Sequence, residues 1–198
     1  METRIEIQQY IPALQPEWDC FIANSRNGTF LFFRNYMDYH SDRFIDNSLL
    51  FRYKGKLIAV LPANREGDVL WSHQGLTYGG LVLSSKCTAD RVLNIFSLLF
   101  SWLSEQGFSK LVYKCVPDIY HRYPSQEDLY ALFRNNARLV ARNLSTTVSI
   151  PCRIPFSQLR RRGIKRALSC GIVVQESSDL ENFWRVLSEN LSDRYNRL

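Results

Sequence analysis

The sequence predicts an α/β protein with a mixed, mostly antiparallel sheet flanked by helices. Residues 49–62 form two strand-like runs joined by Lys54-Gly55-Lys56, a pattern typical of a hairpin with a tight turn. Residues 88–106 repeat apolar side chains at helical spacing, and an apolar run at 110–116 follows them. A strand-helix-strand unit after a hairpin is typical of layered α/β domains.

The elements before the hairpin alternate between strand and helix. A strand is expected at 5–10, and a helix from Pro16 to about Asn24 has an acidic residue in its first turn. Asn27-Gly28 breaks that helix, and a second short helix is expected at 34–40. In the hairpin, the strands are expected at 49–53 and 57–62.

The later elements follow from turn, cap and period signals. The turn at 66–68 predicts a third strand of the same meander at 69–73, and strand character returns at 81–83. Thr88 is the expected N-cap of the long helix, and Gly107 is its expected C′ residue. The remaining expected elements are a strand at 110–116, a loop at 117–124, a helix from an N-cap at Ser125 to about Asn136, one or two strands at 137–150, a basic helix with Pro155 in its first turn, a strand at 172–175 and a helix at 179–195.

Composition excludes several classes of protein. Of the 198 residues, 45% are hydrophobic and 22% are charged, which is typical of a globular domain with a sizeable core. The acidic N-terminus lacks the apolar region of a secretory signal, and the longest apolar stretch, 92–103, is too short to cross a bilayer. We therefore expect a cytoplasmic protein.

Cysteine and histidine spacing gives no sign of a metal site. The chain has 5 cysteines and 3 histidines, all widely separated. An odd number of scattered cysteines is typical of buried thiols in a reducing compartment, and no pair has the spacing of zinc ligands. We therefore expect neither a disulfide framework nor a metal cofactor.

The net charge of +6 comes from one segment. Residues 151–170 contain six basic residues and no acidic one, so the rest of the chain is balanced. This distribution indicates one local anion-attracting element on a neutral body, because a nucleic-acid-binding domain spreads its charge over a face.

Several groups of residues, in their order along the chain, carry a resemblance to a known family. They are Trp18-Asp19 with Phe21, Gly28–Phe32, Gly55–Pro62, Thr77–Gly80, Arg162–Ala167 and Gly171–Val174. With the order of elements, this set resembles the GNAT N-acyltransferase fold, and more specifically its FemABX-type branch, in which two such domains occur in tandem. The match covers nearly the whole chain and rests on the ordered set, since no single motif is specific.

The resemblance implies a division of the chain into three parts. Residues 1–150 would be the first GNAT-like domain, 151–170 a basic linking helix, and 171–198 the beginning of a second GNAT-like domain. The chain would then be a fragment of a longer protein or a shortened member of the family. The apolar face of the helix at 179–195 favours a fragment, or a face completed by another copy in a homodimer.

The resemblance implies an acyltransferase that moves an acyl or aminoacyl group to an amine of a cell-envelope or surface-polysaccharide precursor. The donor would be acyl-CoA or aminoacyl-tRNA, and the partner a phosphorylated or nucleotide-linked precursor. Two alternatives stay open: a catalytically silent GNAT-like module that binds or dimerises, and a tRNA-binding protein that uses residues 160–166.

The candidate catalytic residues are His121 and Tyr120. They lie in a loop after an apolar strand, where rigid scaffolds commonly carry chemistry, and Arg122 beside them is a candidate substrate-binding residue. Acyl transfer to an amine needs a base for the ammonium proton and an acid for the leaving group, which histidine and tyrosine can supply. The alternative is a purely structural aromatic loop.

Tyr78, Gly79 and Gly80 are candidate substrate-binding residues. Consecutive glycines let a backbone approach a ligand or adopt positive φ, although a plain loop explains them as well. In the fold that the chain resembles, this segment would lie where the substrate cleft opens. The other candidate substrate-binding residues are Tyr36, His40 and Arg43, for which aromatic packing is the alternative.

The candidate cofactor-binding residues lie in the basic segment and are Arg160, Arg161, Arg162, Gly163 and Lys165. GNAT enzymes bind the CoA pyrophosphate on a loop of pattern Gln/Arg-x-x-Gly-x-Gly/Ala that leads into a helix. This segment fits the first four positions and fails the last, and the family's loop would be expected before the helix at Thr88. A platform for a phosphorylated partner and a solvated helix face are the alternatives.

Overall fold

The computed structural model describes residues 5–195, and the chain divides into two compact units, residues 1–140 and 141–198. The helices of the first unit are α1 (Gln15–Asn24), α2 (Arg34–Met37), α3 (Ala89–Glu105) and α4 (Glu127–Arg134), with 3-10 turns at Pro12–Leu14, Phe30–Phe32, Asp38–His40 and Asp118–Tyr120. Its strands are β1 (Ile5–Gln9), β2 (Ile45–Asp46), β3 (Leu49–Tyr53), β4 (Lys56–Leu61), β5 (Asn64–Glu66), β6 (Val69–Trp71), β7 (Val82–Leu83) and β8 (Lys110–Val112).

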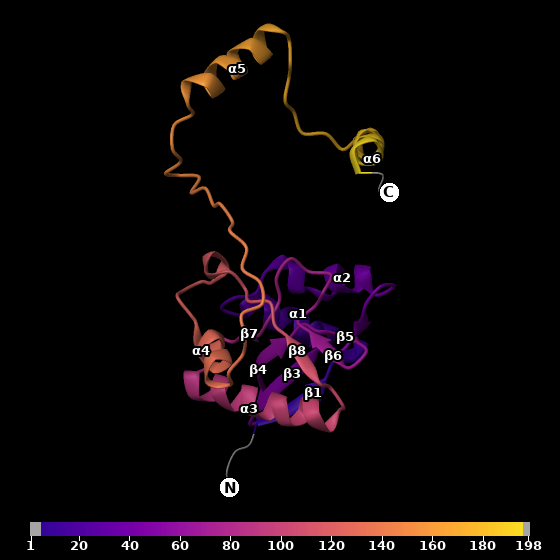
Figure 1. Ribbon diagram of the computed structural model, residues 1–198, viewed down its shortest axis with the longest axis vertical. Helices are drawn as coiled ribbons and strands as arrows, with labels where there is room; N and C mark the ends of the chain where they lie inside the picture. The colour runs from indigo at the N-terminus through magenta and orange to yellow at the C-terminus, as the bar shows by residue number, and fades with distance from the viewer. Residues whose placement is uncertain (1–4, 196–198) are drawn as a thin grey trace. The chain divides into compact units, whose positions relative to one another are not determined.

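The strands form two sheets of four strands each. Their orders are β1-β3-β4-β7 and β2-β5-β6-β8. The first sheet is antiparallel throughout, and the second has one parallel pair, β6 with β8. The predicted α/β class with a mixed, mostly antiparallel sheet flanked by helices is confirmed (Figure 1).

The predicted hairpin is β3 and β4, and its turn explains their register. Lys54 and Gly55 both have positive φ, 52° and 72°, which defines the two-residue turn that matches strand twist. The predicted third strand of this meander is wrong in its pairing, because β6 pairs with β5 in the other sheet. Pro62 follows β4 directly and has no N–H to continue the ladder, so the chain leaves the first sheet there.

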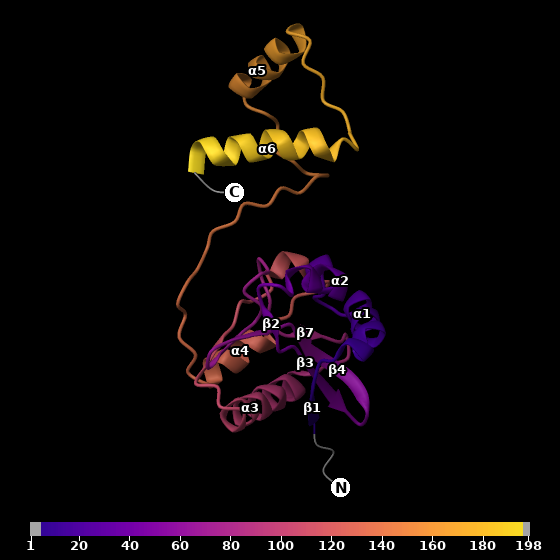
Figure 2. The same cartoon turned by 90° about the vertical axis from the view of Figure 1, so that its right-hand side faces the viewer.

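The first sheet is covered by helices on both faces. Along β3, Leu49 and Phe51 pack in the cluster that includes α3, whereas Leu50 packs in the cluster that includes Trp18 of α1. This alternation is the two-residue period of a strand buried on both sides. Figure 2 shows α3 on one side of the strands and α1 with α2 on the other.

The long helix forms as predicted. Its buried residues Val92, Ile95, Phe96, Leu99 and Leu103 lie at helical spacing and pack against the first sheet. Thr88 is at the N-cap position, although its side chain makes no capping hydrogen bond. The following strand is shorter than predicted, Lys110–Val112 in place of 110–116, because pairing with β6 ends at Trp71.

The cap predicted for the next helix is wrong by one residue. Gln126, and not Ser125, is the N-cap residue of α4. The Ser125 hydroxyl instead donates to Glu127 Oε2 at 2.7 Å, so it is engaged by a side chain of the first turn. Glu127 in turn forms an ion pair with the buried Arg26 at 3.1 Å, which ties the start of α4 to the segment after α1.

The second unit consists of α5 (Gln158–Ser169), α6 (Leu180–Tyr195) and irregular segments. All of residues 137–150 and 172–175 are described and none is in a strand, so both strand predictions are wrong. Val148 and Val173 are exposed, and a strand needs a neighbour to pair with, which strand propensity alone does not supply. Pro155 precedes α5 and is not in its first turn, because Ser157 is the N-cap.

Within residues 5–195, no helix combines the length and the apolar character needed to cross a membrane.

All five cysteines are free thiols: Cys20, Cys87, Cys115, Cys152 and Cys170.

Candidate functional site

Two segments that the sequence predicts separately as site candidates, 78–80 and 120–122, meet in the first unit. The ring of Tyr120 stacks on the ring of Tyr78, with centroids 5.0 Å apart and planes inclined by 27°. Tyr78 is buried and donates its hydroxyl to Thr29 Oγ1 at 3.1 Å, whereas Tyr120 is 46% exposed. Burial raises the pKa of Tyr78, so this residue stays protonated at neutral pH. The stack therefore has a fixed inner ring and an accessible outer one.

The glycines beside Tyr78 allow close backbone packing. A Cβ on Gly79 would lie 1.9 Å from the Ser72 carbonyl oxygen, and one on Gly80 would lie 2.8 Å from the Lys114 carbonyl oxygen. Gly80 also has a φ of 86°, in the region that favours glycine. Contact with the chain's own backbone therefore gives both residues a packing role, independent of any ligand.

Tyr113 and Asp128 form a buried pair beneath this loop. The Tyr113 hydroxyl donates to Asp128 Oδ2 at 2.8 Å and accepts from the Leu81 backbone N–H at 2.7 Å. Burial, with the Asp128 carboxylate as a second cause, raises the pKa of Tyr113, and burial also raises that of Asp128. Nothing local in the sequence indicates this pair, because only the packing of α4 on α3 brings the two residues together.

His121 follows Tyr120 and is half-buried. Neither ring nitrogen has a hydrogen-bond partner among the described residues, although both nitrogens are buried. The charge of a protonated His121 would lower the pKa of Asp128, which places the imidazole within electrostatic range of that carboxyl. An unengaged imidazole can accept a proton, which is what a general base must do.

Three hydrogen bonds fix the loop that carries His121. Arg122 Nη2 donates to the Ala23 carbonyl oxygen at 2.7 Å, and the Arg122 backbone N–H donates to the Arg26 carbonyl oxygen at 2.8 Å. Tyr123 donates its hydroxyl to the Ser85 carbonyl oxygen at 3.0 Å. Arg122 therefore anchors the loop to the end of α1.

Tyr36, His40 and Arg43 lie in and after α2, in a separate aromatic group. His40 packs edge to face against Tyr36 and Phe44, with centroids 6.1 and 6.2 Å apart. Arg43 is exposed and pairs with Asp42 at 3.6 Å. Within residues 5–195, no hydrogen bond, ion pair or ring contact joins any of the three to Tyr78, Tyr120 or His121, so the predicted substrate residues fall into two groups.

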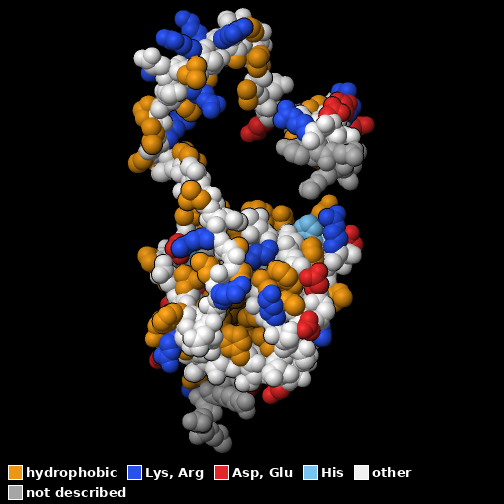
Figure 3. Space-filling model, viewed as in Figure 1, with side chains coloured by type: hydrophobic (Ala, Val, Ile, Leu, Met, Phe, Trp, Pro, Cys, Tyr) orange, Lys and Arg blue, Asp and Glu red, His pale blue; other side chains and the backbone are white. Residues whose placement is uncertain are grey.

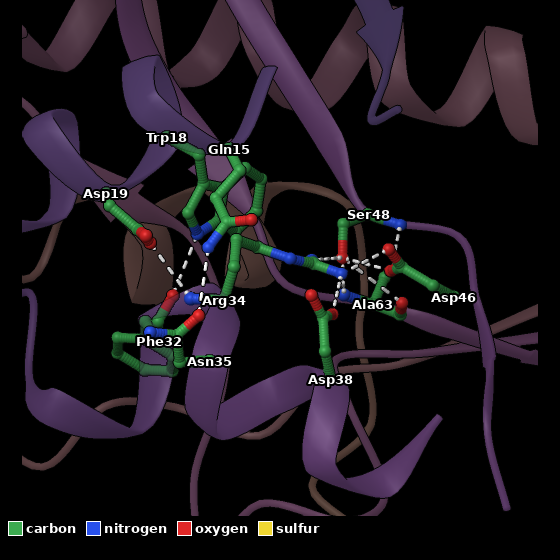
Figure 4. Close-up of polar contacts among 10 residues, drawn as sticks. All are labelled: Gln15, Trp18, Asp19, Phe32, Arg34, Asn35, Asp38, Asp46, Ser48 and Ala63. Carbon is green, nitrogen blue, oxygen red and sulfur yellow. Dashed lines mark hydrogen bonds and ion pairs between the residues drawn. The ribbon is translucent and has the colours of Figure 1, made fainter. Parts of the chain in front are cut away.

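A buried arginine holds α2 in place (Figure 4). Arg34 is 2% exposed, and its guanidinium contacts Asp38 at 2.5 Å and Asp46 at 2.6 Å. The same guanidinium lies 3.8 Å from the centroid of the Tyr10 ring, and the Arg34 backbone N–H donates to Asp19 of α1 at 2.9 Å. This arginine therefore joins α2 to α1, to β2 of the second sheet and to Tyr10, which follows β1.

His73 and Lys114 form a second cluster, which lies outside the candidate residues predicted from the sequence. His73 is buried with a φ of 62°, and its Nδ1 has no partner among the described residues. Lys114 Nζ donates to the carbonyl oxygens of Gln74 and Leu76 at 3.2 and 2.5 Å, and burial lowers its pKa. The only signal in the sequence was a histidine at the end of a strand, which does not reveal burial.

The basic residues lie on α5 in the second unit and are exposed. Figure 3 shows Lys and Arg side chains along this helix, with apolar side chains among them. The Ser157 hydroxyl accepts from the Arg160 backbone N–H at 3.4 Å, so the helix begins before the arginines. Arg161, Arg162, Gly163 and Lys165 are therefore inside the helix, and their backbone N–H groups are not those of a phosphate-binding helix terminus.

Comparisons with known proteins add one likeness. No family model and no curated protein matches the chain. Among solved structures, the chain is similar to aminoglycoside N-acetyltransferase AAC(6′)-Iy, determined in complex with CoA. The identity is 8%, the TM-score is 0.43, and the match covers 77% of this chain and 98% of that one. We transfer no activity from this likeness, and membership of the FemABX-type branch stays a prediction. No group of His, Cys, Asp and Glu suited to a metal ion occurs within residues 5–195.

Proposed function

We propose that the first unit is an acyltransferase domain that transfers an acyl group from a CoA thioester to an amine. The observation that carries this proposal is the stack of Tyr120 on Tyr78, which joins the Gly79-Gly80 loop to the loop of His121. These two loops come from segments about 40 residues apart, and each holds residue types that acyl transfer uses.

In the proposed reaction, His121 accepts the proton of the attacking ammonium group. The neutral amine nitrogen then bonds to the thioester carbonyl carbon, and the carbon–sulfur bond breaks. Tyr120 gives its hydroxyl proton to the leaving thiolate, and the nitrogen gives its second proton to the resulting tyrosinate, which restores the tyrosine. The free imidazole nitrogens of His121 and the exposure of Tyr120 support these roles. Arg122 supports them by anchoring the loop.

The finer points of the proposal come from the family resemblance. The acceptor is an amine of a cell-envelope or polysaccharide precursor, and a phosphorylated or nucleotide-linked precursor suits the basic surface of α5. The second proposed donor is aminoacyl-tRNA, whose phosphates would bind to the basic side chains of α5.

The test measures CoA release by the full chain from acetyl-CoA, with glucosamine and lysine as acceptor probes. We expect amine-dependent release that falls about a hundredfold in kcat/KM in His121→Gln, because general-base catalysis contributes at least that much. Tyr120→Phe should cause a smaller loss. The matched control is Tyr130→Phe, which removes the hydroxyl of an exposed tyrosine on α4.

Two results would contradict the proposal. One is the absence of amine-dependent CoA release from either probe. The other is a His121→Gln variant as active as the Tyr130→Phe control.

A binding module is the second candidate function, and the second unit favours it. In α6, Leu180, Phe183 and Trp184 are 72%, 63% and 60% exposed. Residues 171–195 carry five acidic and two basic residues, whereas 151–170 carry six basic and none acidic. A second copy would match both features, since α6 of one chain complements α5 of the other in charge and apolar surface.

Sedimentation of the full chain tests this candidate. A concentration-dependent dimer should be lost in a Phe183→Glu, Trp184→Glu variant, because carboxylates would replace apolar contacts. Phe133→Glu, at a 74% exposed position in the first unit, is the control. A chain that is monomeric at all concentrations, or a dimer that persists in the α6 variant, would count against it.

A further inference from the structure

The helix α5 of the second unit holds apolar side chains in water beside its basic residues. Leu159, Ile164 and Leu168 are 82%, 42% and 67% exposed. Phe156, which directly precedes the N-cap residue of this helix, is 54% exposed. Single exposed apolar residues are ordinary, whereas a set gathered on one short helix indicates a surface that contacts another body.

The apolar and basic residues of α5 lie on opposite halves of the helix. At about 3.6 residues per turn, Leu159 and Leu168 fall at the two edges of one half. Between these edges lie Gly163, Ile164 and Ala167. The opposite half carries the basic residues Arg161, Arg162, Lys165 and Arg166. Arg160 is the exception on the apolar half, where a long side chain can turn its charge toward water while its methylene groups stay on the apolar side.

The charge of α5 has one sign. The helix contains five basic residues and no acidic one. All five are exposed, and none forms an ion pair within residues 5–195. Just before the helix, the guanidinium of Arg153 lies 5.9 Å from the centroid of the Phe156 ring, which adds a cation beside an apolar side chain. A partner that covers this helix must therefore offer negative charge.

An anionic lipid bilayer offers both features that this helix requires. Headgroup phosphates match the basic half, and the boundary between headgroups and acyl chains takes up the apolar half. A nucleic acid would match the charge but leave Leu159 and Leu168 in water. The helix α6 shows the contrast, because it also exposes apolar side chains but has three acidic and two basic residues, so it lacks the positive charge.

We propose that α5 is a membrane-surface helix that lies in the plane of an anionic bilayer. Its apolar half faces the acyl chains, and its basic half contacts the headgroups. A helix of 12 residues is too short to span a bilayer, so the contact is confined to the surface. The inference goes beyond the proposed function, since it requires neither an acyl donor nor His121.

The test is flotation of the full chain with phosphatidylcholine vesicles, with and without an equal amount of phosphatidylserine. We expect binding to the anionic vesicles that added salt weakens, and much weaker binding to phosphatidylcholine alone. The charge variant is Arg161→Gln, Arg162→Gln, Lys165→Gln. It should weaken binding to the anionic vesicles about a hundredfold, because each basic residue near such a surface adds to the attraction.

A second variant separates a bilayer from a nucleic acid. Leu159→Gln, Leu168→Gln keeps every charge of α5, and glutamine forms helix about as well as leucine. This variant should weaken binding to the anionic vesicles by about tenfold or more, because its apolar half is interrupted at both edges. Its affinity for a single-stranded RNA should equal that of the parent, since phosphates contact only the basic side chains.

The matched control is Leu180→Gln, Phe183→Gln on α6, at positions that are 72% and 63% exposed. It should bind the anionic vesicles as the parent does. The same control separates the bilayer from a second copy, because the dimer proposed above needs the apolar side chains of α6 and vesicle binding does not. His121→Gln should also retain vesicle binding, which separates this proposal from the acyltransferase.

Four results would overturn the proposal. The first is a chain that does not float with the anionic vesicles, and the second is a chain that floats equally well with phosphatidylcholine alone. The third is a Leu159→Gln, Leu168→Gln variant that binds the vesicles as the parent does, which would leave only a general attraction for anions. The fourth is an α6 control that loses as much binding as this variant.

Discussion

Replacing Arg34 by methionine should lower the free energy of unfolding by about 3 kcal/mol, because it removes the cation from a buried ionic cluster. Arg34 is 2% exposed and contacts Asp38 and Asp46 while stacking on Tyr10. Methionine fills similar volume but leaves the two carboxylates without their cation. Both are partly exposed and recover some hydration, which keeps the cost near the lower end for broken buried pairs.

A less buried arginine gives the matched control. Arg52 contacts both oxygens of Glu17 at 2.6 Å, so its geometry is as good as that of Arg34, but its side chain is 17% exposed, against 3% for Arg34. Arg52→Met should cost about 1 kcal/mol or less, since exposed ion pairs contribute little. Urea unfolding followed by tryptophan fluorescence measures both. Equal losses in the two variants would show that burial of Arg34 is not what matters.

The elements that the sequence predicts well are those in which local signals and burial agree. The β3-β4 hairpin has alternating side chains and a turn sequence that permits positive φ, and α3 has a wide apolar face that the sheet covers. The strands predicted at 137–150 and 172–175 rested only on a composition that is typical of strands. Their apolar residues find no partner edge among the described residues, so strand propensity was not realised.

The residues of the candidate site also fall into two sets, those that local signals predict and those that only the packing reveals. His121 and Tyr120 could be selected from residue type and position after a strand, because such loops commonly carry chemistry. The pairing of Tyr113 with Asp128 could not, since it depends on how α4 packs on α3. Arg34 was also out of reach, because nothing local distinguishes a buried arginine from an exposed one in a short helix.

His73 should make the protein less stable as the pH falls from about 6.5 to about 4. Burial lowers the pKa of His73 from 6.5 to about 4, since a charged imidazole loses its hydration there. The nearby charges act in both directions, with Asp46 raising this pKa and Arg34, His40 and Lys114 lowering it. The neutral imidazole is therefore the form that the folded protein holds.

The direction of the pH dependence follows from which state binds the proton. Above pH 6.5 the imidazole is neutral in both states, and His73 adds no pH dependence. Between pH 6.5 and 4 the unfolded chain takes up a proton that the folded protein does not, so stability falls by about 1.4 kcal/mol per pH unit from this group, or roughly 3 kcal/mol in all.

The test compares the unfolding free energy of the parent and His73→Asn at several pH values. Asparagine does not titrate and accepts the φ of 62° that this position requires, so the variant should fold. Because every other group is common to both proteins, the difference between their pH profiles isolates His73. We expect the unfolding free energy of the variant to rise relative to that of the parent below pH 6.5, by about 3 kcal/mol at pH 4. Parallel profiles over that range would show that His73 is protonated in the folded protein as readily as in the unfolded chain.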